Sequence, residues 1–525
     1  MSKQSIVHHK IAIIGTGFSG LGMAIQLKQS GEEDFVVFEK ESGVGGTWRV
    51  NHYPGCACDV PSHLYSFSFA QKPDWTRMFA PQHEIRSYLE YCADQYKIMP
   101  HVRLKTAVNS ARWDDNNGHW RVEDDSGRQY SADVLIAGAG GLSIPSYPSI
   151  DGMDKFKGKT FHSQNWDHDY DLKGKRVAVI GTGASAIQFV PHVQRQAASL
   201  SLYQRTPPWI LPKPDRAISK VEKRLFKYSP RSQQLFRDAL YWLYESRAVG
   251  FSFDPRVMSL AKHWALKHIK AQIKDPQLRD KVTPDYTIGC KRILMSDDYY
   301  SALDQQNAEV ITNGIAEVTA NSIITKDGNE QKVDAIIFGT GFKATDPIPR
   351  GFLFGRNGQD INDAWANGPE AYKGTTVAGF PNLFILMGPN TGLGHNSMVY
   401  MIESQIAYVK SALTFMSQQK TPFIDVSANR QQDYNKKIQK KLTGTVWDSG
   451  GCQSWYIHPA SGKNVTLWPG FTWQFRLQTR SFDPSAYYTD PIYNQYSGKQ
   501  HPRKQVKTRK SSSPQPILQT TKAPA

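Results

Sequence analysis

The chain has 525 residues, of which 39% are hydrophobic and 21% charged, and its formal net charge is +16 at pH 7. This length suits roughly two to four domains with cores of their own. No stretch approaches the ~20 consecutive apolar residues that a membrane-spanning helix needs, so stable membrane insertion is not expected. A predicted strand begins about ten residues into the chain, which leaves no room for a cleavable targeting segment and predicts a cytoplasmic protein.

The distribution of charge and cysteine narrows the class further. Residues 491–525 hold seven Lys and Arg and no acidic residue in a Ser-, Pro- and Gln-rich sequence, which predicts a disordered basic tail. The body then carries about +9, which suits polyanionic cofactors, and no nucleic-acid partner is expected. The cysteines are Cys56, Cys58, Cys92, Cys290 and Cys452. Because they are odd in number and scattered along the chain, we expect reduced thiols and no metal site.

A glycine-rich turn follows the first predicted strand. Residues 11–14 are apolar, a helical pattern follows the turn, and a second strand is predicted at 35–38. In such a unit the glycines allow a tight turn and the helix N-terminus faces a pyrophosphate. Glu39 stands 19 residues after Gly20, where a carboxylate accepts a hydrogen bond from a ribose hydroxyl. The candidate cofactor-binding residues are Gly15, Gly17, Phe18, Ser19, Gly20, Glu39 and Lys40.

The same pattern recurs after a predicted strand at 176–180. Here the residue that stands 19 positions after Ala186 is Arg205. A carboxylate repels a 2′-phosphate, whereas a guanidinium pairs with it. The first unit is therefore predicted to bind FAD and the second NADPH. The candidate residues of the second unit are Gly181, Thr182, Gly183, Ala184, Ser185, Arg205 and Thr206.

Closing strands predict how the two units are connected. Both the segment from Asp133 to Gly140 and that from Asp334 to Gly341 run from Asp to Gly in seven steps, so the second unit is nested inside the first. The predicted fold class is α/β, with two nested Rossmann-like dinucleotide-binding domains and a helical insertion. The expected boundaries are FAD domain 1–150 and 346–490, NADPH domain 151–213 and 282–345, insertion 214–281, and basic tail 491–525.

The insertion is predicted to be helical, aromatic and basic. Its apolar residues, among them Leu235, Trp242 and Trp264, are expected to form a stripe that faces a core beside the NADPH unit. Contact of this basic aromatic surface with a membrane is the alternative.

Two further sequence motifs, here called strings, indicate which molecule the reduced flavin reacts with. Gly45-Gly46-Thr47-Trp48 is not followed by a redox cysteine pair, which argues against a disulfide reductase. It continues to Tyr53-Pro54-Gly55 and Asp59, and the second string is Phe156-x-Gly158-xxx-His162-xxx-Trp166-Asp167. Over about residues 8 to 480 the chain resembles the Baeyer–Villiger monooxygenase family, which both strings match. Flavin-containing monooxygenases that oxidise nitrogen or sulfur have Tyr at the position of Trp166.

This resemblance implies an activity and a set of roles. In that family NADPH reduces FAD, oxygen adds to flavin C4a, and the peroxyflavin inserts one oxygen atom beside a ketone carbonyl, giving an ester or lactone. Arg292 is then expected to stabilise the peroxyanion, Asp59 to tune Arg292, and Lys291 to join Arg205 at the 2′-phosphate. The string Phe156, Gly158, His162, Trp166 and Asp167 is expected to couple cofactor binding to conformation. Further cofactor-binding positions are expected at Gly46, Thr47, Trp48, Tyr65, Thr340, Gly341, Asn390 and Thr391.

Several alternatives stay open from the residues. An N- or S-oxygenating monooxygenase shares much of the pattern, as does an NADPH oxidase that releases peroxide, and a non-catalytic nucleotide- or nucleic-acid-binding protein is a third reading. His162 and Trp166 share one face only if their segment is helical. His395 is expected to be a helix-start histidine satisfied by backbone. The aromatic residues after 447 predict either a pocket wall or a domain core, and they resemble the branch that acts on aryl or open-chain ketones.

Overall fold

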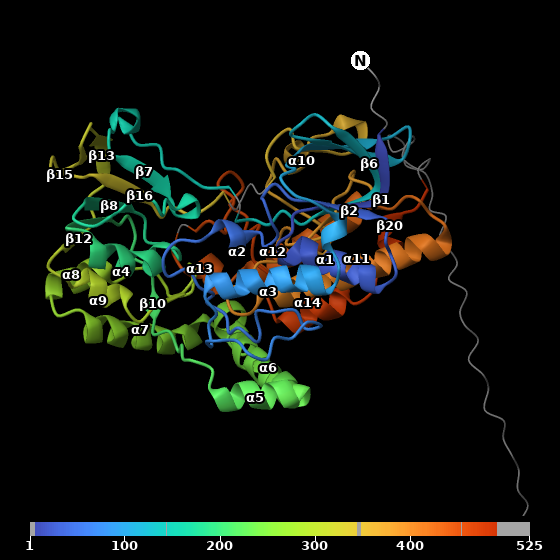
Figure 1. The fold of residues 1–525 in the computed structure, drawn as a ribbon. Helices are drawn as coiled ribbons and strands as arrows, with labels where there is room; N and C mark the ends of the chain where they lie inside the picture. The colour runs from blue at the N-terminus through green and yellow to red at the C-terminus, as the bar shows by residue number, and fades with distance from the viewer. Residues whose placement is uncertain (1–5, 143, 344–347, 453, 491–525) are drawn as a thin grey trace, which may run out of the picture.

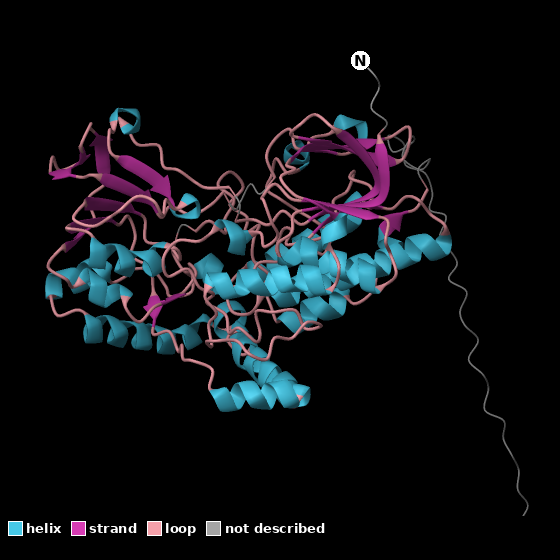
Figure 2. Ribbon diagram, viewed as in Figure 1, coloured by secondary structure: helices cyan, strands magenta, loops and turns pink. Residues whose placement is uncertain are grey.

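A computed structural model describes residues 6–142, 144–343, 348–452 and 454–490, so the predicted basic tail lies outside the described residues. Two large β-sheets, three small ones and a layer of helices make up the described part of the molecule (Figures 1 and 2). Among the described residues, no helix combines the length and the apolar character needed to cross a membrane.

The first sheet is built around the N-terminal strand. A parallel row follows the order β3 (Val102–Arg103), β2 (Phe35–Phe38), β1 (Val7–Ile14) and β6 (Gln129–Ala137), and β18 (Leu383–Ile385) also pairs with β6. Antiparallel β5 (His119–Asp124) and β4 (Val108–Asp114) continue it to β17 (Leu353–Phe354). Residues after 350 thus return to a sheet that began at residue 7, as the nested topology predicts.

The second sheet is entirely parallel. Its order is β12 (Ala308–Ile311), β9 (Ser199–Tyr203), β8 (Arg176–Ile180), β16 (Ala335–Phe338) and β7 (Lys159–His162). Alternate residues of β8 enter different cores: Val177 and Val179 pack with the residues of α4 (Ala186–Gln196), and Ala178 packs toward a small antiparallel sheet. Burial on both faces explains the continuous apolar run in this strand. The small sheet contains β13 (Ile315–Val318), β14 (Ser322–Thr325) and β15 (Glu330–Lys332).

Helices cover one side of the first sheet and continue beneath the second (Figure 2). Helix α11 (Met398–Gln419) contacts both α1 (Phe18–Gln29) and α14 (Thr472–Thr479), and α1 also contacts α3 (Gln82–Gln95). The other elements are α2 (Thr47–Val50), α9 (Tyr299–Leu303), α10 (Ile361–Ala364), α12 (Ala428–Leu442), α13 (Val446–Ser449), β10 (Ile210–Leu211), β11 (Leu294–Met295), β19 (Asp425–Val426), β20 (Tyr487–Tyr488), and the 3₁₀ turns Met99–His101, Met153–Lys155, Ser163–Asn165, Arg356–Gly358 and Pro484–Ala486.

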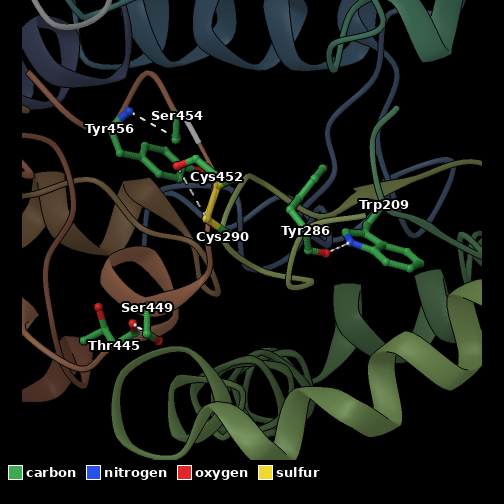
Figure 3. Close-up of a disulfide and its surroundings, with 8 residues drawn as sticks. All are labelled: Trp209, Tyr286, Cys290, Thr445, Ser449, Cys452, Ser454 and Tyr456. Atoms are coloured by element: carbon green, nitrogen blue, oxygen red, sulfur yellow. Dashed lines mark hydrogen bonds between the residues drawn. A yellow bond between two sulfur atoms is a disulfide. The ribbon is translucent and has the colours of Figure 1, made fainter. Parts of the chain in front are cut away.

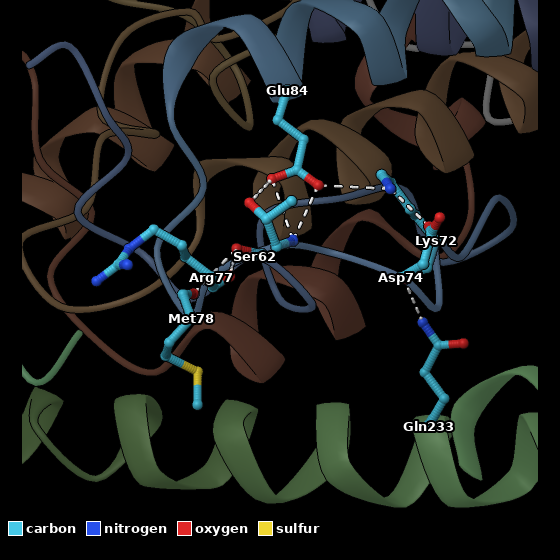
Figure 4. A network of polar contacts seen from close by, with 8 residues as sticks. Ser62, Lys72, Asp74, Arg77, Met78, Glu84 and Gln233 are labelled. Carbon is cyan, nitrogen blue, oxygen red and sulfur yellow. Dashed lines mark hydrogen bonds and ion pairs between the residues drawn. The ribbon is translucent and has the colours of Figure 1, made fainter. Parts of the chain in front are cut away.

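The segment predicted as an insertion is helical but does not pack only beside the second sheet. It contains α5 (Lys220–Tyr228), α6 (Pro230–Glu245), the π-helix η4 (Val249–Phe253), the 3₁₀ turn η5 (Pro255–Val257), α7 (Met258–Gln272) and α8 (Pro276–Val282). On α6, Gln233 donates to the Lys72 carbonyl at 2.8 Å, so α6 packs on a segment that belongs with the first sheet (Figure 4). The expected position was therefore wrong for the first half of the segment.

Figure 4 also shows how the segment on which α6 packs is kept in place. Glu84 on α3 accepts hydrogen bonds from the Thr76 backbone N–H at 3.0 Å and from the Thr76 hydroxyl at 2.6 Å, and it pairs with Lys72. Ser62 donates to the Arg77 carbonyl. A buried carboxylate therefore fixes the loop that receives Gln233.

The expected core-facing stripe of the insertion was also wrong for most of its members. Leu235, Trp242 and Trp264 are exposed, whereas Leu240 and Ile269 are buried. The periodicity predicts a stripe correctly, but the helices turn much of it outward.

One buried carboxyl gives a prediction for stability. Burial raises the pKa of Asp425 from an ordinary value near 3.8 to about 7, although its carboxylate accepts from the Gly379 N–H at 3.0 Å. The native state therefore binds more protons than the unfolded state between these values, and the free energy of unfolding falls as pH rises through that range.

Asp425→Asn keeps the acceptor and removes the ionisation, so we expect the variant to gain stability relative to wild type by up to about 3 kcal/mol as pH rises from 5 to 8. Chemical denaturation at several pH values measures this difference. Asp360→Asn is the matched control, because hydrogen bonds lower the pKa of Asp360 despite its burial and its loss should destabilise at neutral pH. A pH-independent difference for Asp425→Asn would contradict the prediction.

Candidate active site

The turn after β1 has the form of a pyrophosphate cradle. Gly15 has φ +92°, and Gly17 caps α1 with no side-chain hydrogen bond and no acidic residue in the first turn, which contains Phe18, Ser19 and Gly20. A Cβ at Gly46 would lie 2.7 Å from the Gly17 Cα, so the two glycine turns touch through backbone alone. The uncapped N–H groups and the close approach of backbone fit an anionic ligand.

Glu39 lies at the end of β2, beside this turn. Its carboxylate accepts from the backbone N–H groups of Thr16 and Glu41, both at 2.9 Å, and its side chain is buried. These bonds fix the carboxylate next to the cradle. Lys40 is exposed.

Residues from three other segments lie in the same part of the fold. Thr47 begins α2, and the Trp48 indole N–H donates to the Tyr65 hydroxyl at 3.3 Å. Asn390 donates to the carbonyls of Asn464 and Leu467, while its Oδ1 is buried without a partner among the described residues. Thr391 donates to the Gly388 carbonyl at 2.7 Å. Buried acceptors usually have a hydrogen-bond partner, so the unpaired Oδ1 of Asn390 is suited to accept a hydrogen bond from a bound ligand.

The second turn repeats the cradle. Gly181 has φ +104°, Gly183 and Ala184 are exposed, and Ser185 precedes α4 without capping it by a side-chain bond. Thr182 donates to the Thr206 carbonyl at 3.2 Å. Here too the first helical turn carries no acidic residue and has no side-chain cap.

Two bases gather beside the second turn. Arg205 is exposed where β9 ends, and the pKa of Lys291 is lowered by burial and by the nearby charge of Arg205. The Lys291 ammonium lies 4.9 Å from the Tyr286 ring. Two neighbouring cations fit a shared dianionic ligand.

Arg292 and Asp59 form an ion pair between distant segments. The Arg292 Nε and Nη2 atoms donate to Asp59 Oδ2 at 2.9 and 2.6 Å, and Nη1 lies 3.5 Å from the Leu393 carbonyl oxygen. The charge of Asp59 raises the pKa of Arg292, which therefore stays protonated at any physiological pH. Both side chains keep some exposure, 34% and 29%. A fixed cation thus lies where the loop after the first glycine-rich turn, which carries Asp59, meets the segment that carries Arg292.

Tyr456 faces this pair. Burial raises the pKa of Tyr456 to about 12, although the charge of Arg292 acts in the opposite direction. Sequence reasoning counted Tyr456 only as one of several C-terminal aromatic residues, because no local pattern marks it as a neighbour of Arg292.

The loop between Trp48 and Asp59 docks on α4 of the second sheet. Gln188 on α4 donates from Nε2 to the Ala57 carbonyl at 2.9 Å, and its Oε1 accepts from the Tyr53 hydroxyl at 3.0 Å. At Gly55, φ is +79° and a Cβ would lie 2.6 Å from the Gln188 carbonyl oxygen. Only glycine permits this approach. Sequence reasoning missed Gln188, because nothing in an amphipathic helix marks one amide as the partner of a distant loop.

The second string, residues 156–167, also contacts α4. Trp166 lies 5.3 Å from the Phe189 ring, and the Tyr53 ring lies 6.0 Å from Phe189. Asp167 pairs with Lys159. The two strings therefore meet at α4.

The segment from His162 to Trp166 is not α-helical. His162 ends β7, Ser163–Asn165 forms a 3₁₀ turn, and the two side chains point to different neighbours. The His162 Nε2 lies 3.1 Å from the Gly341 carbonyl oxygen, beside Thr340 at the end of β16. At the start of the string, a Cβ on Gly158 would lie 2.5 Å from both the Phe156 ring and the Asp334 carbonyl oxygen.

The expectation that all cysteines are reduced was wrong. Cys290 and Cys452 form a disulfide with a Cα–Cα distance of 6.2 Å (Figure 3). Cys56, Cys58 and Cys92 are free and buried. Both partners lie in loops over one core, where the Thr287 N–H donates to the Gly450 carbonyl. The bridge joins the segment before Arg292 to the segment before Tyr456. Their separation of 162 residues conceals this pairing in the sequence. In the part of the chain that the structure describes, no three His, Cys, Asp or Glu side chains form a group that could hold a metal ion.

The expectation for His395 was wrong as well. His395 precedes Ser397, the N-cap of α11, and neither of its ring nitrogens has a backbone partner among the described residues. Its Nε2 lies 3.7 Å from the Glu245 carboxylate, and both side chains are buried. Glu245 also accepts from the Asn396 amide and the Thr472 hydroxyl, so α6 is attached here by a buried polar network.

Comparison with known proteins identifies the family. Residues 8–350 match the family described as FMO-like, flavin-binding monooxygenase-like. A Baeyer-Villiger monooxygenase of Pseudomonas aeruginosa is 63% identical over 92% of each chain, and a Baeyer-Villiger monooxygenase of Streptomyces coelicolor is 47% identical over 91% of this chain and 92% of the relative. The chain belongs to the flavin-binding monooxygenase-like family, so the predicted family is confirmed.

Solved structures confirm the predicted fold class. The closed crystal structure of cyclohexanone monooxygenase superposes with a TM-score of 0.84 at 25% identity, covering 93% of this chain and all of that one. An oxidized steroid monooxygenase bound to NADP gives 0.80 at 28% identity, covering 90% and 97%. The structure of OTEMO in complex with FAD and NADP gives 0.80 at 26% identity, with the same coverage.

The contact of Gln188 with the docked loop gives a prediction. Gln188→Ala leaves the Ala57 carbonyl and the Tyr53 hydroxyl without this partner, which loosens the loop that carries Asp59. We expect the rate of flavin reduction by NADPH to fall roughly 10- to 100-fold with FAD content unchanged, because small misplacements of reacting groups are costly. Stopped-flow absorbance of the flavin measures it.

Gln194→Ala is the matched control, since Gln194 lies on the same helix but donates to Asn307 within the second unit. Equal effects of the two substitutions would contradict a specific role for the docked loop.

Proposed function

We propose that the chain is a Baeyer–Villiger monooxygenase that uses FAD and NADPH to insert one atom of O2 next to a ketone carbonyl, giving an ester or lactone. The observation that carries the proposal is the Arg292–Asp59 pair, a fixed cation at the junction of two dinucleotide cradles. Two relatives that cover most of this chain have the same activity in their names. We place the enzyme in the cytoplasm.

FAD is assigned to the first cradle. The N–H groups of the α1 N-terminus receive the pyrophosphate, and Glu39 accepts from a ribose hydroxyl. Trp48 and Tyr65 line the cofactor, and Asn390 offers its unpaired Oδ1. The remaining residues assigned here are Gly15, Gly17, Phe18, Ser19, Gly20, Lys40, Gly46, Thr47 and Thr391.

NADPH is assigned to the second cradle. Arg205 and Lys291 pair with the 2′-phosphate, and the N–H groups of α4 receive the pyrophosphate. The remaining residues assigned here are Gly181, Thr182, Gly183, Ala184, Ser185, Thr206, Thr340 and Gly341. His162 positions the Gly341 end of this cradle through its contact with the carbonyl.

The chemistry belongs to the flavin, which accepts hydride from NADPH and activates O2 when bound. The chain supplies charge and position. Arg292 holds a permanent positive charge against negative charge that develops on oxygen, and this interaction strengthens where water is excluded. Asp59 fixes the guanidinium through two hydrogen bonds and partly balances its charge.

Removal of the cation tests this assignment. We expect Arg292→Ala to lower ketone oxygenation by ~10²–10³, the usual effect of removing one donor from a preorganised site. FAD content should remain. Product formation by gas chromatography, alongside NADPH consumption, measures the effect.

Arg195→Ala is the control, because Arg195 pairs with Asp298 on the surface. Ester formation at the wild-type rate by Arg292→Ala would overturn the proposed role.

The two bases of the second cradle predict cofactor preference. Arg205→Ala should raise KM for NADPH roughly 10- to 100-fold and leave KM for NADH nearly unchanged, because NADH lacks the 2′-phosphate. Lys291→Ala should act in the same direction. Steady-state kinetics with both cofactors tests this, and an equal change for both would place the bases elsewhere.

A substrate panel tests the function as a whole. Purified enzyme is supplied with NADPH, O2 and cyclic, linear and aryl ketones plus one sulfide, and products are identified by mass. An ester or lactone 16 mass units heavier than its ketone supports the proposal. Sulfoxide alone would indicate an S-oxygenating enzyme, and hydrogen peroxide without oxygenated product would indicate an NADPH oxidase.

A further inference from the structure

Exposed apolar side chains are concentrated in one region of the molecule. Of the nineteen exposed large hydrophobic residues among those described, twelve lie between Val221 and Leu266. Helices α5, α6 and α7 of this region lie along one edge of the molecule, the lower edge in Figure 1. A patch of this extent on a folded protein indicates a contact surface.

The direction of this surface is clearest on α6. Gln233 and Arg237 face inward, where they donate to the carbonyls of Lys72 and His63. Leu235 and Trp242 face outward and are 71% and 60% exposed. The inner side of the helix thus packs on the body through these polar side chains together with Leu240 and Tyr244, and Leu235 and Trp242 are left on the outside.

The neighbouring helices also expose large apolar side chains. On α5, Val221, Leu225 and Tyr228 are spaced at i, i+4 and i+7 and all are exposed. Such spacing places them on one face of the helix. We call the exposed sides of α5, α6 and α7 the outer face.

Helix α7 also presents an apolar stripe outward. Leu260 and Trp264 are exposed at i and i+4, while His268 on the inner side contacts the Ser296 carbonyl at 2.9 Å. Between α6 and α7, Phe253 of the π-helix stacks on Phe471, 4.9 Å away. This contact extends the outer face to α14.

The charges beside these stripes have one sign. Within residues 219–272, nine of the eleven Lys and Arg are exposed, and Asp238 is the one exposed acidic residue. Exposed Lys and Arg next to Trp, Tyr and Leu are the composition of surfaces that lie in the headgroup region of a membrane. Each base near an anionic membrane adds to the attraction.

We propose that the outer face docks peripherally on an anionic lipid membrane. Two copies meeting through the same face would bring nine exposed bases against nine, which disfavours a symmetric dimer. A lipid surface with anionic headgroups accepts both the apolar stripes and the bases at once. The docking is independent of the proposed oxygenation and does not require any segment to cross the membrane.

The test is co-sedimentation of the full chain with vesicles. Vesicles of phosphatidylglycerol and phosphatidylethanolamine should bind the protein at least about tenfold more tightly than vesicles of phosphatidylcholine, and 0.5 M salt should weaken the binding. The double variant Leu235→Ser/Trp242→Ser should lose at least about tenfold in affinity, because two large apolar side chains no longer enter the lipid. Lys227→Gln/Arg231→Gln should weaken binding to anionic vesicles only.

Tyr91→Ser is the matched control, since Tyr91 is 61% exposed on α3, outside the outer face. FAD content and thermal unfolding verify that every variant is folded. Wild-type protein that does not bind anionic vesicles, or outer-face variants that bind like wild type, would overturn the proposal. A dimer that the double variant dissociates, seen by analytical ultracentrifugation without lipid, would assign the face to a second copy instead.

Discussion

The contact between Asp59 and Arg292 depends on how the segments that carry these two residues are packed together. The two residues are 233 positions apart, and their 2.6 Å contact forms only when the loop after the first cofactor turn and the segment before β11 are brought together. Coulomb attraction falls steeply with distance and with access of water, so a displacement of either segment weakens the pair. Its strength therefore reports whether the two halves of the molecule are docked.

Each side of this pair has its own support. On the Asp59 side, the loop is fixed to α4 by Gln188 and by the close approach at Gly55. On the Arg292 side, the Cys290–Cys452 bridge precedes the guanidinium by two residues. The first support is made of hydrogen bonds and ring contacts, which can form and break, and the second is covalent. The attachment at α4, where both family strings meet, is therefore the one that can loosen without breaking a covalent bond.

The sequence predicted the parts of the fold that depend on local pattern. Sequence reasoning predicted the strand at 176–180, the glycine turns and the nested order of the units. A strand buried on both faces and a tight turn each produce a recognisable pattern within a few residues. The disulfide, the Glu245 partner of His395 and the role of Gln188 were not, because each joins segments more than a hundred residues apart. A single sequence records the residue types at both ends of such a contact but not that they meet.

The inserted helices show a second limit of pattern. Hydrophobic periodicity defines a stripe, yet the side it faces depends on what the opposite side finds to bind. On α6 the opposite side carries Gln233, Arg237 and Glu245, and each of them has a polar partner in the body of the protein. Burying these groups without partners would cost several kcal/mol, so once the body supplies carbonyls and hydroxyls at the right places the polar side is held inward. Leu235 and Trp242 are then left outside because of their neighbours' hydrogen bonds, and apolar surface kept outside in this way is available to a partner.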